Sequence, residues 1–320
     1  MWKIIVRRVL IMIPQLFVLS LLIFILAKQL PGDPFTGLLT PDTDPNRIEE
    51  LRELAGLNDP WYVQYVNWIG NAAQGDFGKS YTYKIKVSTL IGEKALNTFW
   101  LSLVSAIILY LIAIPLGVLA GRYQDTIFDK IIVFYSFVTY AIPTFVLALI
   151  FLFIFGYQLH WFPTVGSVDV KYDPGTAGYF WSKLYHMLLP AITTAILGTT
   201  SVIQYLRSEI IDAKSLDYVR TARSKGIPVN KVYSRHIFRN SLLPIAAFLG
   251  FTITGLLVGS IFIETIFGYP GMGQLFISSL LSRDYSVITA LVMLFGLLAL
   301  LGSLLSDIIM SIVDPRIRIE

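Results

Sequence analysis

The side chains that most often do chemistry are sparse in this chain. Its three histidines, His160, His186 and His236, are scattered, with no spacing that would let them share a metal ion. The chain has no cysteine, which excludes disulfides, cysteine-ligated metals and thiol chemistry. Gly75–Ser80 reads GDFGKS and ends like a phosphate-binding loop, but Ala73 replaces the first glycine of that motif. We therefore expect no metal, no cofactor and no nucleotide site in this chain.

Two carboxylates stand out because they lie in or near apolar runs. Glu264 and Asp307 each lie towards one end of such a run, where burying a charge is costly enough to indicate a function. Pro143 interrupts another apolar run, and broken helices line transport pathways in many membrane proteins. These three residues are our candidates for lining a translocation path. For the carboxylates, bonding to a neighbouring helix or capping a broken one stays equally open.

The elements that must hold these residues are membrane spans. Hydrophobic residues make up 55% of the chain and charged residues 14%, and the mean hydropathy is +0.67, which is typical of an integral membrane protein. The apolar runs reach the roughly 20 residues that a helix needs to cross a bilayer. The sequence predicts an all-α integral membrane protein with six transmembrane helices. The predicted spans are Val9–Leu30, Thr98–Gly121, Ile131–Tyr157, Leu188–Leu206, Leu243–Phe267 and Val287–Val313.

The Lys and Arg residues of the short connections set the expected orientation, because cytoplasmic loops keep a positive excess. With six spans, both termini lie on the same side as the basic connections, and the sequence predicts that this side is the cytoplasm. The expected location is the cell membrane, in multi-pass form. The pI of 9.1 follows from these loops and needs no nucleic-acid partner. Basic residues expected on this side include Lys3, Arg7, Arg8, Arg122, Lys130, Arg316 and Arg318.

Residues 31–97 are too polar to span a membrane, so we expect them to form a small external cap. Asp44-Pro45 and Asp59-Pro60 each predict a helix start, and Gly56 predicts the end of the first of these helices. Aromatic side chains recur at helical spacing in the second helix. They fit an interfacial belt, a docking face for an external partner or the core of the cap, with core or belt favoured. These aromatic residues are Trp61, Tyr65 and Trp68.

The stretch from Arg207 to Pro244 is the most basic part of the chain, with eight of its 25 Lys and Arg residues. A helix is predicted from Arg207 to Lys225, with Gly226 as its left-handed C-cap and Pro228 in the first turn of a second helix. Small or amphipathic side chains near this turn are flanked by basic ones, and we expect them on an exposed surface that another protein can approach. They are Tyr218, Thr221 and Ala222, flanked by Arg220, Arg223 and Lys225.

In this stretch the chain resembles the transmembrane subunits of ABC-type importers, specifically the first permease subunit of the dipeptide/oligopeptide and nickel group. The family's EAA-x3-G pattern falls on Arg220-Thr221-Ala222, with Gly226 as its glycine, and the peptide branch reads close to DYVRTARSKG followed by RHIFRNSLLP. Phe238-Arg239 stands where the general family has Leu-Pro, and Leu243-Pro244 follows a few residues later. Further blocks, in the family's order, extend the resemblance over essentially the whole chain: LPGDPF, GDFGKS, IPLGVLAG, ETIFGYPGMGQL, SRDY and DPRIR.

The resemblance implies the type I importer permease fold and a passive pathway driven by partner subunits. The loop 207–243 is then the part that carries a coupling helix, seated in a groove of an ATPase subunit. The implied partners are a second homologous permease subunit, two ATP-binding subunits that hold ATP and Mg, an external substrate-binding protein, membrane lipid and a peptide substrate. The implied coupling residues are Asp217, Tyr218, Arg220, Thr221, Ala222, Arg223 and Gly226.

The chain divides into four expected parts. Residues 1–30 form a cytoplasmic N-terminus and the first span, 31–97 the external cap, 98–313 a five-helix permease core with the coupling loop, and 314–320 a cytoplasmic tail. A secondary transporter or channel for small solutes also explains six kinked spans, but it predicts inverted repeats or coupling carboxylates deep in the spans. A membrane-embedded enzyme ranks last for want of a catalytic cluster. The substrate stays open among dipeptides, oligopeptides, nickel chelates and glutathione.

Overall fold

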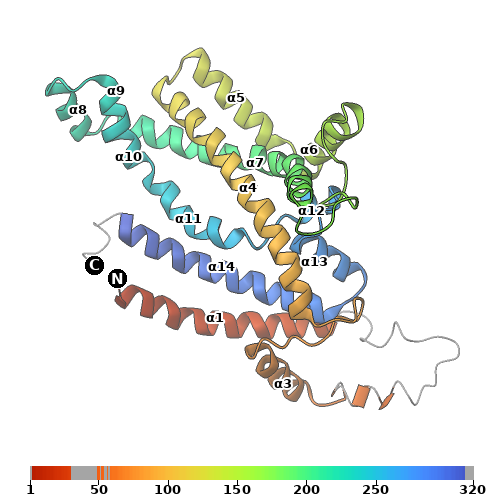
Figure 1. Cartoon of the computed structure of the whole chain (residues 1–320). Helices are drawn as coiled ribbons and strands as arrows, with labels where there is room; N and C mark the ends of the chain where they lie inside the picture. The colour runs from red at the N-terminus through yellow and green to blue at the C-terminus, as the bar shows by residue number, and fades with distance from the viewer. Residues whose placement is uncertain (1, 30–48, 51, 54–55, 57, 314–320) are drawn as a thin grey trace.

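The computed structural model describes the chain apart from residues 1, 30–48, 51, 54–55, 57 and 314–320, and the described part is predominantly helical (Figure 1). Its strand-like pairing is limited to an isolated antiparallel bridge between Lys79 and Lys86. The predicted all-α class is confirmed. In chain order the helices are α1 (Trp2–Gln29), α3 (Trp61–Ala73), α4 (Val87–Arg122), α5 (Ile127–Ala141), α6 (Thr144–Phe151), η2 (Leu152–Gln158, a π-helix), α7 (Ala177–Ala213), α8 (Asp217–Ser224), α9 (Val229–Lys231), η3 (Val232–Ile237, a π-helix), α10 (Phe238–Ser241), α11 (Leu243–Gly255), α12 (Ile261–Ile266), α13 (Met272–Leu281) and α14 (Tyr285–Val313).

Four helices of the described part are each long and apolar enough to cross a membrane alone: α1, α4, α7 and α14. Two further spans are broken. The segment α5 is bent by 102° against α6 and η2, and the segment α9 to α10 is bent by 48° against α11. Counting each bent pair as one span gives six, the number predicted from the sequence.

The predicted span Ile131–Tyr157 is broken at Pro143, the residue that the sequence indicated as interrupting it. Directly after α5, Ile142 and Pro143 are extended, with ψ angles of 121° and 142°. Proline has no N–H to donate and disfavours a helical backbone in the residue before it, so the chain turns here. Pro115 and Pro190, by contrast, stay inside the continuous helices α4 and α7.

The predicted fifth span, Leu243–Phe267, is also too long. The helix α11 stops at Gly255, and α12 starts only at Ile261. Between them Gly259 has a φ of +74°, a left-handed conformation that suits glycine, and the side chain of Ser260 then caps α12. The apolar run therefore forms a span followed by a short separate helix.

Glycines bring two pairs of spans into close contact. A Cβ on Gly121 of α4 would lie 2.7 Å from the Cβ of Ile210 in α7. A Cβ on Gly250 of α11 would lie 2.2 Å from the backbone nitrogen of Ser306 in α14. Neither place has room for a side chain, so α4 packs closely on α7 and α11 on α14, as small residues allow in membranes. The helix α1 lies along the other side of α14 (Figure 1).

The segment between α1 and α4 packs onto α1 through α3. Tyr65 is buried, its hydroxyl oxygen lies 2.8 Å from Oγ of Ser20, and its ring meets that of Phe24 edge-on with centroids 5.5 Å apart. Trp68 also contacts Phe24, at 6.0 Å between centroids, whereas Trp61 is exposed. The aromatic residues singled out in the sequence therefore divide between the packed interior of this segment and its surface.

The helix α3 starts at Trp61, directly after Pro60, as predicted. The start predicted at Asp44-Pro45 lies outside the described residues.

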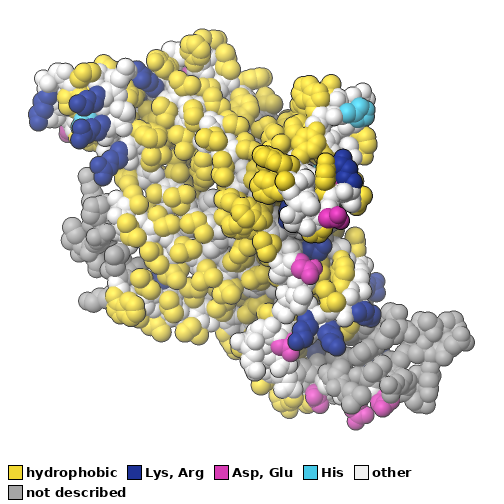
Figure 2. Space-filling model, viewed as in Figure 1, with side chains coloured by type: hydrophobic (Ala, Val, Ile, Leu, Met, Phe, Trp, Pro, Cys, Tyr) yellow, Lys and Arg dark blue, Asp and Glu magenta, His cyan; other side chains and the backbone are white. Residues whose placement is uncertain are grey.

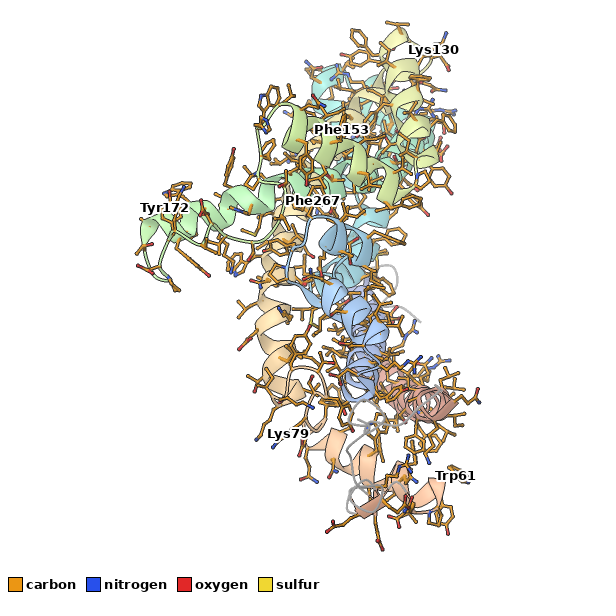
Figure 3. All side chains as sticks on the ribbon, turned by 90° about the vertical axis from the view of Figure 1, so that its right-hand side faces the viewer. Trp61, Lys79, Lys130, Phe153, Tyr172 and Phe267 are labelled. Atoms are coloured by element: carbon orange, nitrogen blue, oxygen red, sulfur yellow. The ribbon has the colours of Figure 1, made fainter. Side chains whose placement is uncertain are left out.

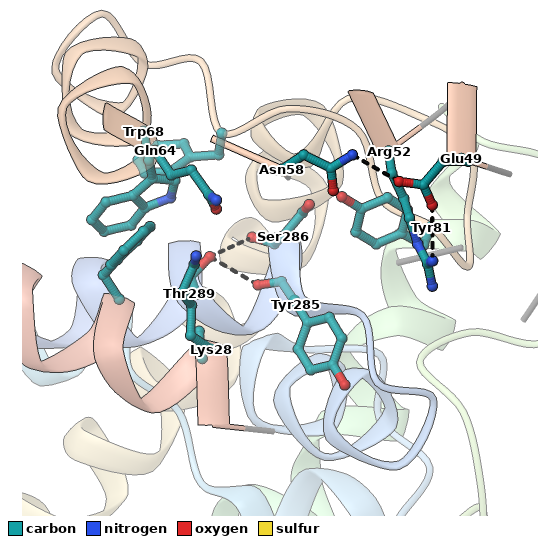
Figure 4. Close-up of a pocket in the computed structure, with 13 residues that line it drawn as sticks. Lys28, Glu49, Arg52, Asn58, Gln64, Trp68, Tyr81, Tyr285, Ser286 and Thr289 are labelled. Atoms are coloured by element: carbon teal, nitrogen blue, oxygen red, sulfur yellow. Dashed lines mark hydrogen bonds and ion pairs between the residues drawn. The ribbon is translucent and has the colours of Figure 1, made fainter. Parts of the chain in front are cut away.

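A cavity of about 460 Å³ lies between α1, α3 and the first turns of α14, and the Trp68 ring and the Lys28 side chain are among the groups that line it (Figure 4). On another side of the molecule, the start of α7 and the loop before it project from the helices, with Tyr172 near the tip (Figure 3).

The motif GDFGKS ends in a buried structural contact. The hydroxyl of Ser80 donates a hydrogen bond to Oδ2 of Asp284 at 2.5 Å, and the backbone N–H of Thr82 donates to the same oxygen at 3.0 Å. Ser80 and Asp284 are both buried. The contact ties the segment before α4 to the turn between α13 and α14, which are far apart in the sequence.

Candidate functional site

The basic stretch folds as a short helix, a tight turn and a second helix at one end of the molecule (Figure 1). The prediction of a single helix from Arg207 to Lys225 is wrong, because α7 ends at Ala213 and α8 begins only at Asp217. The predicted C-cap is confirmed. Gly226 has a φ of +71°, the left-handed conformation that glycine adopts without strain.

The break after α7 turns the inner face of α8 onto the core of this chain. Val219 and Ala222, three positions apart on one helix face, are 0% and 4% exposed. The prediction that Ala222 lies on an exposed surface open to a partner is therefore wrong. Its small side chain instead lets α8 pack closely within the chain. The buried cluster also contains Leu206, Ile210, Ala213, Val232, Ile237 and Ile245.

The outer face of α8 carries polar and charged side chains. Asp217 and Arg220 are 97% and 73% exposed and form an ion pair at 3.7 Å, which contributes at most about 1 kcal/mol because water screens it. The hydroxyl of Thr221 donates to the carbonyl of Asp217 at 2.9 Å. Figure 2 shows Lys and Arg side chains gathered at this end of the molecule. The outward-facing members of the predicted set are Asp217, Tyr218, Arg220, Thr221, Arg223 and Gly226.

Buried polar contacts hold the elements beneath α8 together. Arg207 of α7 donates to both carboxylate oxygens of Asp129 in α5, at 2.6 and 2.8 Å, and the Asp129 side chain is only 3% exposed. Lys214, in the turn before α8, donates to the carbonyl of Arg122 at 3.2 Å, and burial lowers the pKa of its ammonium group. These contacts therefore link the C-terminal end of α7 and the turn before α8 to the start of α5 and the end of α4.

Sequence reasoning missed two buried carboxylates, Asp129 and Asp284. Each lies at the start of an apolar run, and the same signal singled out Glu264, so both could have been candidates. Their partners carry no such signal, because Arg207 and Ser80 lie 78 and 204 positions away in the chain.

Glu264 joins three segments and has no exposed surface. Its Oε1 accepts a hydrogen bond from the hydroxyl of Thr98 in α4 at 2.9 Å. Its Oε2 accepts from the backbone N–H groups of Gly273 and Gln274, at 2.6 and 3.1 Å, in the first turn of α13. These N–H groups have no partner inside their helix, so Glu264 acts as the cap of α13. Capping a helix was one of the roles that the sequence left open.

The three candidates for a translocation path do not converge. Pro143 is exposed at the break between α5 and α6, and Glu264 is enclosed between α4, α12 and α13. Asp307 lies near the end of α14, where it forms a salt bridge with Arg8 of α1 at 2.6 Å. Among the described residues, no three His, Asp or Glu side chains come together as metal ligands. The arrangement best suited to a partner is the outer face of α8.

Comparison with known proteins gives two family matches and several relatives. Residues 113–319 match the family described as "Binding-protein-dependent transport system inner membrane component", and residues 1–101 match its N-terminal membrane component family. The chain is 40% identical over 315 residues to the oligopeptide transport system permease protein AppB of Bacillus subtilis (strain 168). It is 32% identical over 314 residues to the glutathione transport system permease protein GsiC of Escherichia coli (strain K12). Each alignment covers 98% of both chains.

Proposed function

Because this chain belongs to the family of binding-protein-dependent transport system inner membrane components, we propose that it forms half of the pathway of an ATP-driven peptide importer. It is a multi-pass membrane permease component of such a transport system. A peptide substrate is supported by its similarity to permeases named for oligopeptide and glutathione transport. A second homologous permease subunit supplies the other half of the pathway, and an external binding protein delivers the substrate.

The outer face of α8 is the proposed contact with an ATPase subunit. Arg220 and Thr221 lie on it and are exposed, next to the pattern that resembles the family's coupling motif. ATP and Mg bind to the ATPase subunits in this proposal, and the permease responds mechanically. Ala222 has a different part: its burial fixes α8 to the chain's own core rather than to the partner.

The buried contacts give the mechanical route. Force applied to α8 passes through Val219 to the core cluster of α7, η3 and α11. From α7 the force reaches α4, because Gly121 allows these two helices to pack closely. It also reaches α5, because Arg207 forms an ion pair with Asp129. Closure of the ATPase pair thereby moves several spans together, the kind of rigid-body change that switches a pathway between two sides.

The proposed orientation puts α8 in the cytoplasm. The first turns of α1 and the end of α14 lie at the same end of the molecule as α8 (Figure 1), in keeping with cytoplasmic termini. Figure 2 shows basic side chains at this end and a second group at the opposite end, so the proposed orientation rests on the Lys and Arg residues of the short connections. Pro143 stays a candidate for the translocation path because it is exposed at a break in a span. Glu264 and Asp307 enter this proposal as residues that position helices.

The test is to tag this chain, extract it gently from its native membrane and identify the proteins that accompany it by mass spectrometry. We expect a second multi-span subunit and ATPase subunits. The informative variant combines Arg220→Glu with Thr221→Trp, which reverses a charge and adds bulk on the exposed face of α8. The matched control combines Lys130→Glu with Gln124→Trp, also exposed at the same end of the molecule.

The α8 variant is expected to insert normally and to lose the ATPase subunits, at least tenfold in recovered amount, while keeping the second permease. The control variant is expected to keep both. A chain that purifies alone, or an α8 variant that keeps its ATPase, would overturn the proposal. Transport by the purified chain alone, driven by a solute gradient, would favour a secondary transporter or channel.

A further inference from the structure

Three cations beyond the turn after α8 have no partner in the part of the chain that the structure describes. Lys231, Arg235 and Arg239 are all exposed, and their side chains take part in no hydrogen bond, ion pair or ring contact there. Some cations at this end are engaged, such as Arg207, which binds Asp129, whereas the exposed side chains of Arg223 and Lys225, in α8 and directly after it, also have no partner among the described residues. Within the described residues, these three cations form a set without a counter-charge.

The helix geometry places these cations on one side. They lie four positions apart across α9, η3 and α10. In an α-helix, residues four apart drift by about 40° around the axis, because each residue turns by about 100°. The π-helix η3 has more residues per turn, so it counteracts this drift and keeps the three side chains aligned. Val232 and Ile237, five positions apart, are both 0% exposed and mark the opposite, inner face.

This basic face lies on the first, polar part of a bent span and leads directly into the apolar part, α11. The segment that carries it continues into α11 through a 48° bend, and α11 begins at Leu243, four residues after Arg239, or about 6 Å along a helix axis. The apolar run that follows starts at once. Lys or Arg at such a position reaches the level of the lipid headgroups. Figure 2 shows Lys and Arg side chains, in dark blue, at this end of the molecule.

We propose that Lys231, Arg235 and Arg239 bind the phosphate groups of anionic phospholipids in the adjoining leaflet, and so hold the bend before α11 at the membrane surface. Charge favours this partner, because each Lys or Arg near an anionic membrane surface increases binding about fivefold, equivalent to about 1 kcal/mol. Position favours it as well, because the cations directly precede an apolar span. This inference goes beyond the proposed function, since lipid binding of this kind requires neither ATP nor an ATPase.

The experiment measures which lipids stay with the full-length chain. The tagged chain is reconstituted into vesicles of equal parts phosphatidylglycerol and phosphatidylcholine, extracted gently, and its retained lipids are quantified by mass spectrometry. The test variant carries Lys231→Gln, Arg235→Gln and Arg239→Gln. The charge-matched control carries Lys79→Gln, Lys84→Gln and Lys86→Gln, three exposed cations of the segment before α4. A conservative variant exchanges Lys and Arg at the same three positions of the basic face.

The unaltered chain is expected to retain more phosphatidylglycerol than the vesicle composition predicts. The test variant is expected to lose at least fivefold of this excess, while the control and conservative variants keep it. High salt should reduce the excess in the unaltered chain, because salt screens exposed charges. If the triple variant does not insert, Arg235→Gln alone should lower the excess severalfold.

Equal retention of phosphatidylglycerol in the test and control variants would overturn the inference. So would unchanged lipid retention in a test variant that loses ATPase subunits when it is extracted from the native membrane, because the basic face would then be a protein contact. Failure of the proposed function has a different signature: the chain would purify without ATPase subunits whichever lipid it retains.

Discussion

The hydroxyl of Thr98 in α4 donates a hydrogen bond to Glu264 of α12 across 166 positions of the chain, with 2.9 Å between Oγ1 and Oε1. The same hydroxyl oxygen accepts a hydrogen bond from the backbone N–H of Met272 at 2.7 Å. Thr98 and Glu264 therefore share the task of satisfying the first N–H groups of α13. Three segments that the sequence separates by loops become one packed unit at this point.

Glu264→Ala should destabilise the folded chain by roughly 3 kcal/mol or more, because it leaves two buried N–H groups unpaired and opens a cavity. Glu264→Gln should cost about 1 kcal/mol, since its amide oxygen still accepts from α13, while its NH2 group faces the Thr98 hydroxyl as a donor and the charge at the helix N-terminus is lost. The thermal unfolding midpoint in detergent measures both. Equal midpoints for the two variants would show that the hydrogen bonds of Glu264 are not what stabilises this unit.

Ser80→Ala should loosen the segment before α4 without unfolding the chain. The change removes a buried donor from Asp284, which costs about 1–3 kcal/mol and raises the population of locally open forms about tenfold. Trypsin can report this opening, because exposed Lys79, Lys84 and Lys86 flank the contact. We expect faster cleavage there in Ser80→Ala.

Thr82→Ala is the control for this measurement. It keeps the backbone N–H that donates to Asp284 and removes only an exposed hydroxyl, which donates to Ser282 at 3.1 Å. Its cleavage rate should match that of the unaltered chain. Identical rates in Ser80→Ala and Thr82→Ala would contradict a clamping role for Ser80.

Asp129 and Arg207 should behave as a coupled pair. Asp129→Ala leaves a partly buried guanidinium without its carboxylate, and Arg207→Ala leaves a buried carboxylate unpaired, so each single change should cost roughly 3 kcal/mol. The double variant should cost less than the sum by at least about 1 kcal/mol. The exposed pair Asp217 and Arg220 is the control, with a coupling below about 1 kcal/mol. If the stability losses of the two single variants of the buried pair simply add, the ion pair does not hold α5 and α7 together.

The sequence was sufficient for the class, the number of spans and the position of the turn at Gly226. Each rests on a local property: the length of an apolar run, or the conformational freedom of glycine. The break at Pro143 is also a local effect, and the proline marks its position in the sequence. Hydropathy does not show the size of the bend, 102°, because the residues on both sides are apolar.

What the sequence could not supply are relationships between distant residues. Ala222 is small, and a small residue permits close approach by any neighbour, whether a partner protein or the chain's own core. Only the path of the chain after α7 decides between these two. In the same way, Glu264 was recognised as costly to bury, but its partner Thr98 lies in another helix and is an ordinary residue for a span.

The position of Ala222 leads to a final prediction about α8. Ala222→Glu should lower the amount of folded protein, because it forces an unpaired carboxylate into a core cluster where the native side chain is 4% exposed. Thr221→Glu, one position away on the exposed face, should leave folding unchanged. The amount of monodisperse protein after detergent extraction and its unfolding midpoint distinguish the two variants. If both folded equally well and only Ala222→Glu lost an ATPase partner, Ala222 would face that partner in the assembled transporter. The burial of Ala222 predicts the opposite result. Ala222→Glu should impair folding of this chain, and substitutions on the outer face of α8 should impair only the binding of a partner.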